Sequence, residues 1–150
     1  MNLYGVLKFL HVLSVVLWIG GVAALWITTL RMARAGDYPT VARLLPVGMR
    51  YGQSVVGPAS GIVLITGIWM AYTGHLFKTV WVAIGITGIT LHFILGPTLV
   101  QRNWMEIGRL VDDPNRDPAR LAAAIKGATT TSWLYLLIMI VVIGAMVLKP

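Results

Sequence analysis

The sequence predicts an all-α integral membrane protein, a four-helix bundle that forms a single transmembrane domain over residues 1–150. Hydrophobic residues make up 57% of the chain and charged residues only 11%, whereas soluble domains average about 25% charged residues. Four apolar segments are long enough to supply the roughly 20 residues with which a helix crosses a bilayer. They cover about residues 3–30, 54–72, 79–100 and 130–148. We therefore expect the lipid bilayer to be the protein's immediate partner.

The first connection, residues 31–53, is basic and holds a single acid, Asp37. Asp37 followed by Pro39 is typical of a helix start, with Asp as the N-cap and Pro in the first turn. We therefore expect a short helix in this connection. The basic residues of the whole connection are Arg31, Arg34, Arg43 and Arg50.

The other two connections differ in length. Residues 73–78 can form only a tight turn between spans two and three, whereas residues 101–129 are much longer. Within the longer one, Asp117–Pro118 predicts the start of a helix that runs directly into the fourth span.

Lysine and arginine are distributed unequally between the two sides of the predicted bundle. The first and third connections together hold nine of the twelve basic residues, and the opposite side holds Lys8, Lys78 and Lys149. Because cytoplasmic loops are enriched in Lys and Arg, we expect these two connections to be cytoplasmic and both termini to face outward. The formal charge of +7 then reflects topology and contact with anionic lipid, not binding of nucleic acid.

Glycine and proline residues occur within the predicted spans. Gly57 and Gly61 form a G-x-x-x-G step, which lets helices approach closely in lipid and is compatible with a homodimer. Pro58 and Pro97 lie inside spans two and three, where we expect them to kink or locally unwind the helices.

The predicted membrane interior lacks acids and thiols. All five Asp and Glu residues lie in the first and third connections, and the chain has no cysteine. Proton-coupled transporters and hard-cation sites need carboxylates or other oxygen ligands at depth. These function classes are therefore disfavoured.

Two histidines, His11 and His92, do lie at membrane depth, on spans one and three. An ionisable side chain there is costly and is a candidate for function by default. Two imidazoles on different helices, without acids or thiols, suit haem iron. Measured from the start of its own span, His92 lies about 8 Å deeper than His11, at 1.5 Å per residue. This mismatch leaves open whether one histidine or both would bind the iron.

Cations at the outer face could meet the haem propionates. Lys8 and Lys78 are placed there, with His75 as a further candidate. Copper is the alternative metal, with His11, His75 and His92 as its ligands. A third alternative is a structural or partner-binding subunit without a cofactor, in which both deep histidines are satisfied internally.

The first span carries the pattern K-x-x-H-x-x-S-x-x-x-W-x-G-G, formed by Lys8, His11, Ser14, Trp18 and the pair 20–21. This pattern resembles a group of small bacterial membrane proteins that includes HemJ-type protoporphyrinogen oxidases, CopD-like copper-resistance membrane domains and proteins of unknown function. The resemblance covers spans one to three. The W-x-G-G pair is most similar to the CopD-like and unknown-function branch, and residues 23–31 lack the histidine usual in HemJ sequences.

The resemblance implies a bacterial inner-membrane (cytoplasmic-membrane) protein that binds haem b and acts, if it is an enzyme, as an oxidoreductase with a redox partner. It implies that His11 and Lys78 form a functional pair. The candidate cofactor site is therefore His11, His92, Lys78, Ser14 and Trp18, with His11 and His92 as the metal ligands.

Overall fold

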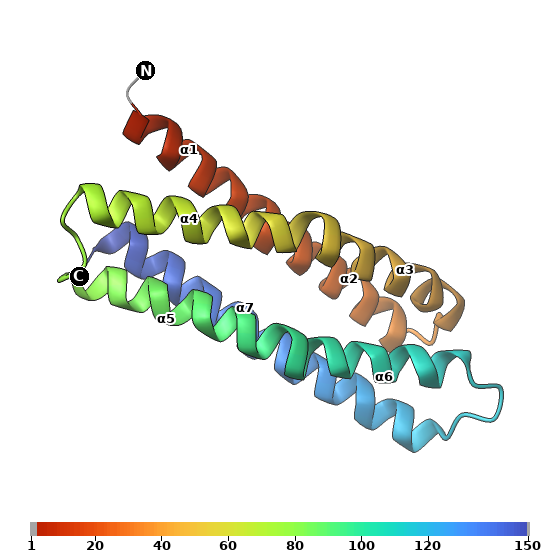
Figure 1. Cartoon of the computed structure of the whole chain (residues 1–150). Helices are drawn as coiled ribbons and strands as arrows, with labels where there is room; N and C mark the ends of the chain where they lie inside the picture. The colour runs from red at the N-terminus through yellow and green to blue at the C-terminus, as the bar shows by residue number, and fades with distance from the viewer. Residues whose placement is uncertain (1–2, 150) are drawn as a thin grey trace.

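The computed structural model describes residues 3–149, which form four long antiparallel helices (Figure 1). Helix 1 consists of α1 (Leu3–Val15), the π-helical segment η1 (Val16–Gly20) and α2 (Gly21–Arg34). Helix 2 consists of α3 (Tyr38–Tyr51), η2 (Gly52–Val56) and α4 (Gly57–Thr73). Helix 3 consists of α5 (Val80–Leu95), η3 (Gly96–Val100) and α6 (Gln101–Asp112), and helix 4 is α7 (Pro118–Leu148).

The structure confirms the four-helix architecture, and its helices are longer than the predicted spans. Each of the four is apolar and long enough to cross a membrane, and each predicted span lies within one helix, with Thr79 immediately before α5. The first connection is much shorter than expected, because helix 2 begins at Tyr38 and only residues 35–37 link it to helix 1. The helix expected in that connection is thus the first part of helix 2.

Both predicted helix starts have the expected caps. The Thr40 amide donates to Asp37 Oδ1 at 3.2 Å, and the Ala119 amide donates to Asp117 Oδ1 at 2.9 Å. Each carboxylate thereby satisfies an N–H group that the helix leaves without a partner. Hydrogen bonds from the side chain and amide of Thr40 lower the pKa of Asp37 below its usual value.

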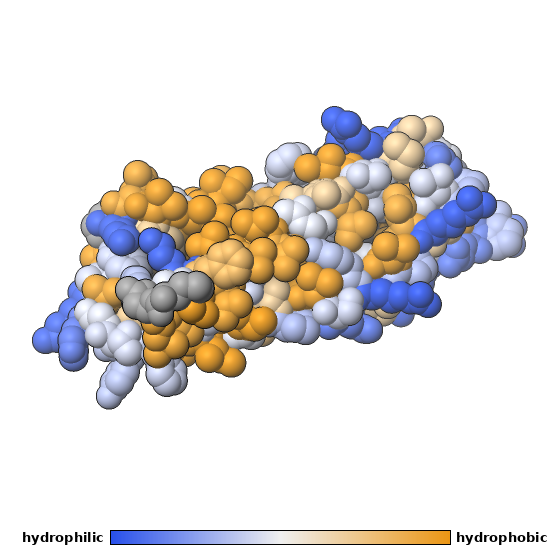
Figure 2. All heavy atoms as spheres, turned by 90° about the horizontal axis from the view of Figure 1, so that it is seen from above, coloured by the Kyte–Doolittle hydropathy of each residue, from blue (hydrophilic) through white to orange (hydrophobic). Residues whose placement is uncertain are grey.

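The helices are longer than a bilayer is thick. They contain 31 to 36 residues, which corresponds to about 46–54 Å at 1.5 Å per residue, against about 30 Å of hydrocarbon. We call the end with the links 35–37 and 113–117 the basic end, and the end with both termini and the turn 74–79 the terminal end. On the face in Figure 2, hydrophobic side chains gather toward the terminal end, and hydrophilic ones are prominent at the basic end.

The basic end has a protein core of its own, which explains why helices 2 and 3 continue beyond the predicted spans. Val41 of α3 and Ile107 of α6 are both 0% exposed at its centre. Packing of these amphipathic segments against each other stabilises helix where a connection was expected, since burial of an apolar face is what stabilises most protein helices. The buried members of this core are Leu30, Ala33, Val41, Ile107, Leu110, Val111, Leu121 and Ala128.

Packing differs between the two ends. At the basic end, α2 contacts both α3 and α7, and α6 contacts both α3 and α7. Toward the terminal end, α1 packs chiefly against α4, and α5 packs chiefly against α7. The four-helix packing is thus tightest at the basic end and becomes two helix pairs toward the terminal end.

Three helices contain a π-helical segment near their middle. Pro58 lies two residues after the end of η2 and Pro97 lies within η3, and a proline cannot donate the backbone hydrogen bond of a regular helix. The local unwinding expected at the prolines therefore takes the form of π-helical segments. Helix 1 has no proline there, but the Leu17 carbonyl in η1 accepts a hydrogen bond from the Tyr51 hydroxyl of helix 2.

The glycines contribute to packing selectively. A Cβ on Gly21 would overlap the ring of Tyr51, and a Cβ on Gly88 would overlap Val142 of α7. Gly61 of the G-x-x-x-G step has no atom within 4 Å of an added Cβ in the described chain. That step therefore does not pack the helices of one chain together.

Candidate functional site

His11 lies half-buried on α1 and faces α4. Its Nδ1 lies 2.9 Å from Thr66 Oγ1, and the Thr66 hydroxyl donates to the Ile62 carbonyl at 2.6 Å. A hydroxyl has one proton to donate, and when Thr66 gives it to Ile62 it accepts the hydrogen bond from Nδ1–H of His11. In that tautomer the lone pair is on Nε2.

The α4 surface is shaped to receive this imidazole. A Cβ added to Gly67 would lie 3.2 Å from His11 Cε1, closer than carbon atoms normally pack. The missing side chain at Gly67 therefore makes room for the ring, directly beside the threonine that binds it. Ser14 follows one turn after His11 on α1 and is also buried, at 6% exposure.

His92 lies half-buried on α5 in different surroundings. Its Nδ1 is hydrogen-bonded to the Tyr135 hydroxyl of α7, and its ring centroid lies 4.2 Å from that of Trp18. Trp18 belongs to η1 and is only 3% exposed. Its indole Nε1 lies near the Tyr135 hydroxyl but has no hydrogen-bond partner among the residues that the structure describes.

The two histidines lie at different levels of the bundle. Trp18, whose ring lies tilted against that of His92, comes seven residues after His11 on helix 1, about 10 Å along the axis at 1.5 Å per residue. His11 contacts helix 2, whereas His92 contacts helices 1 and 4. The level difference expected from the sequence is therefore present, and the two imidazoles do not face each other across one shared centre.

The remaining predicted site residues lie at the terminal end. Lys78 and His75 are exposed in the turn that joins α4 to α5, and His75 has a left-handed backbone with φ 54°. Lys78 makes no ion pair within residues 3–149. In the same range, no group of three or more His, Asp or Glu side chains gathers in a way that could hold a metal ion.

Aromatic side chains continue from His92 toward the basic end. The ring centroids of Trp26 and Tyr135 lie 5.4 Å apart in an edge-to-face arrangement, and Trp26 stacks on Trp104 at 6.3 Å. Such pairs add roughly 0.5–1.5 kcal/mol each beyond the burial of their surface. His92 is thus packed against one end of an aromatic cluster.

Neither His11 nor His92 lines either of two cavities on the described part of the chain. One of about 380 Å³ lies on the outer surface of α4 and is lined by Ile65, Ile68, Trp69, Tyr72 and Thr73. The other, of about 440 Å³, lies at the basic end between helices 1 and 4.

Sequence reasoning did not single out Tyr135, Gly67 or Tyr51. Tyr135 and Thr66 bind histidines that are 43 and 55 residues away in the sequence, so no local spacing could reveal these pairs. Only the position of Trp18 hinted at the aromatic contacts of His92, because Trp18 lies near the middle of its span and away from the interfaces where Trp usually lies.

Comparison with known proteins places the chain in a family. Residues 5–150 match the model of the family described as "Predicted integral membrane protein (DUF2269)". No curated protein matches the chain, and no solved structure matches it either. Since the matched segment covers nearly the whole chain, the protein belongs to this family of integral membrane proteins.

Proposed function

We propose that the protein binds haem b within the membrane through His11 and has a redox or electron-transfer role. The observation that carries this proposal is the imidazole of His11, which Thr66 of the neighbouring helix holds at Nδ1; in the tautomer with the proton on Nδ1, Nε2 has a lone pair for a metal. Histidines that ligate metals commonly donate their other ring N–H to a fixed acceptor in this way.

The donor set fits a haem with one histidine ligand better than a haem with two. His92 lies against Trp18, about two helical turns along the bundle from His11, so the two imidazoles do not share one centre. We therefore assign His92 and Trp18 to the packed wall below the site, and Ser14 to the buried face of α1 beside the ligand. When bound, the haem would supply one-electron chemistry.

Lys78 and Lys8 are the proposed cationic residues at the terminal end. Both are exposed, and neither forms an ion pair in the described part of the chain. They are free to bind the propionates or, in the enzymatic form of this proposal, the carboxylates of a porphyrinogen substrate. The similarity of the first-span motif to HemJ-type oxidases supports an oxidoreductase of this kind.

We further place the protein in the bacterial inner (cytoplasmic) membrane, with the basic end in the cytoplasm. The Lys and Arg distribution supports this orientation. At Gly57 and Gly61 an added Cβ would meet no atom of another helix within 4 Å in the described chain, and we propose that a second copy or a redox partner packs on this face.

Absorption spectra of purified variants test the ligand assignment. We expect His11→Ala to abolish or shift the Soret band, and the exposed His75→Ala to leave it unchanged. Thr66→Val removes the acceptor that orients His11, and outer-shell losses of this kind weaken metal binding by about 10–100-fold. A band that persists in His11→Ala but disappears in His92→Phe would contradict the assignment.

Metal analysis separates the alternatives. Stoichiometric copper without porphyrin, lost on removal of His11, His75 or His92, would replace haem by a copper-handling function. A colourless, metal-free protein whose fold is unchanged in the His11→Ala/His92→Ala variant would favour a structural or partner-binding subunit.

A further inference from the structure

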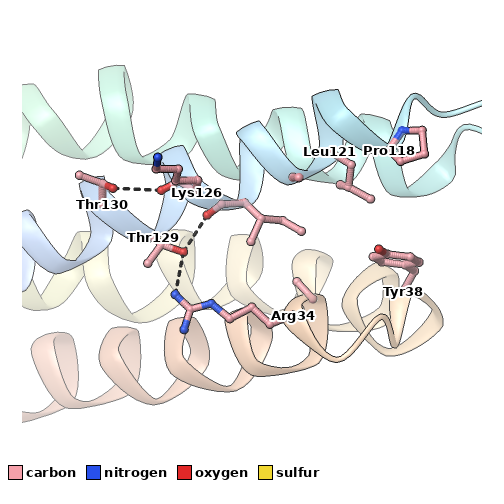
Figure 3. A pocket seen from close by; sticks show the side chains of 10 residues that line it. Arg34, Tyr38, Pro118, Leu121, Lys126, Thr129 and Thr130 are labelled. Atoms are coloured by element: carbon pink, nitrogen blue, oxygen red, sulfur yellow. Dashed lines mark hydrogen bonds between the residues drawn. The ribbon is translucent and has the colours of Figure 1, made fainter.

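The cavity at the basic end lies between the end of helix 1 and the beginning of helix 4 (Figure 3). Its volume is about 440 Å³. Its lining combines cations and hydroxyls with an apolar wall and includes Ala33, Arg34, Tyr38, Leu121, Lys126 and Thr129. It is thus neither part of the proposed haem site nor a purely hydrophobic surface.

Arg34 and Lys126 supply the positive charge of this cavity. Arg34 Nη2 donates to Thr129 Oγ1 at 3.3 Å, and Thr129 in turn donates to the Ile125 carbonyl at 2.7 Å. Within the described residues no carboxylate lies within 4 Å of Arg34 or Lys126. A guanidinium has five N–H donors, so most donors of Arg34 remain available to a ligand.

A third cation stands beside the cavity. The guanidinium of Arg116 lies 4.7 Å from the centre of the Tyr38 ring, which forms part of the lining. Positive charge is thereby concentrated at one opening between two helices. These cations favour an anionic ligand.

The cavity also lies where a membrane surface is expected. Arg34 ends helix 1 four residues after the predicted end of the first span, and Lys126 precedes the predicted start of the fourth span by four residues. The same two helices expose apolar side chains farther from the basic end, among them Ile27 (38%) and Leu134 (54%). From these positions we expect the cavity to lie at the depth of the phosphates of a lipid leaflet.

We infer that this cavity binds the phosphate group of an anionic phospholipid. Arginine can bind phosphate oxygens in a bidentate manner, and lysine adds a compact positive charge. Basic pockets between transmembrane helices are suited to such head groups. Free phosphate offers the same charge, but the position at the membrane surface and the apolar wall around Leu121 favour a phosphate that carries acyl chains. The inference does not depend on the proposed haem site.

The test measures binding of a soluble short-chain phosphatidylglycerol to the full-length protein in a neutral detergent. The lipid should raise the thermal unfolding midpoint as it saturates the folded state, and short-chain phosphatidylcholine should not. Each Lys or Arg near an anionic lipid contributes roughly fivefold to binding. Arg34→Gln/Lys126→Gln should therefore weaken phosphatidylglycerol binding by roughly 30-fold.

Arg43→Gln/Arg109→Gln is the matched control, because it removes two exposed arginines of the basic end that lie outside the cavity. It should bind phosphatidylglycerol like the wild type. Equal weakening in both double variants, or none in Arg34→Gln/Lys126→Gln, would overturn the site. Equal stabilisation by inorganic phosphate would overturn the lipid as its ligand. If Arg34→Gln/Lys126→Gln does not fold, the single variant Lys126→Gln tests the site. It should bind phosphatidylglycerol roughly fivefold more weakly than the wild type, and unchanged binding would contradict the inference.

Discussion

The Gly20–Gly21 pair offers two adjacent positions with opposite surroundings, and alanine at each tests how helix 1 packs on helix 2. A Cβ on Gly21 would overlap the ring and hydroxyl of Tyr51, whereas a Cβ on Gly20 would meet no atom within 4 Å in the described chain. Because the Tyr51 hydroxyl donates to the Leu17 carbonyl, displacement of the ring would also break that hydrogen bond.

The expected difference between the two variants can be worked out from these contacts. Exchange of glycine for alanine inside a helix stabilises by about 1 kcal/mol, and both variants gain this. At Gly21, overpacking costs about 1–3 kcal/mol and the lost hydrogen bond about 1 kcal/mol. We therefore expect Gly20→Ala to raise the free energy of unfolding by up to about 1 kcal/mol and Gly21→Ala to lower it by about 1–3 kcal/mol.

Unfolding of the detergent-solubilised protein, followed by circular dichroism during titration with a denaturing detergent, measures this difference. Tyr51→Phe is the control for the hydrogen bond alone and should lower the free energy of unfolding by about 1 kcal/mol. Equal stability of Gly20→Ala and Gly21→Ala, or a less stable Gly20→Ala, would refute the packing described here.

Two further predictions concern the basic end. Changing Ile107, which is 0% exposed, to alanine should lower the free energy of unfolding by about 2–5 kcal/mol. The same change at Ile140, which is 60% exposed on α7, should alter the free energy of unfolding by no more than about 0.5 kcal/mol. Similar values for the two variants in an unfolding titration would contradict a core at this end. The Thr40 hydrogen bonds lower the pKa of Asp37 in the folded state, so their stabilisation is present above the unfolded pKa of about 3.9 and is lost as the pH falls through the lower folded pKa. NMR titration should give Asp37 a pKa below its ordinary value, and a value at or above it would contradict the cap.

The sequence was sufficient to predict four helices because apolar segments of this length have few alternatives in a membrane. It did not show that helices 2 and 3 extend into the basic connections. That extension depends on Val41 and Ile107 meeting across two helices, and neither local segment is apolar enough to indicate a span.

The sequence singles out His11 as a candidate ligand but does not reveal the residues around it. His11 was recognisable because an imidazole inside an apolar helix needs a partner. Its partner Thr66 and the adjacent Gly67 depend on the register between α1 and α4, which no spacing within one helix determines. The pairing of His92 with Tyr135 depends in the same way on how α5 meets α7.

The absorption spectrum of the wild-type protein, purified from haem-replete cells and recorded in the oxidised and reduced states, tests most directly whether His11 holds haem b. We expect a Soret band that shifts on reduction, with one haem per chain. A colourless protein that retains its helical circular dichroism would contradict the proposed function.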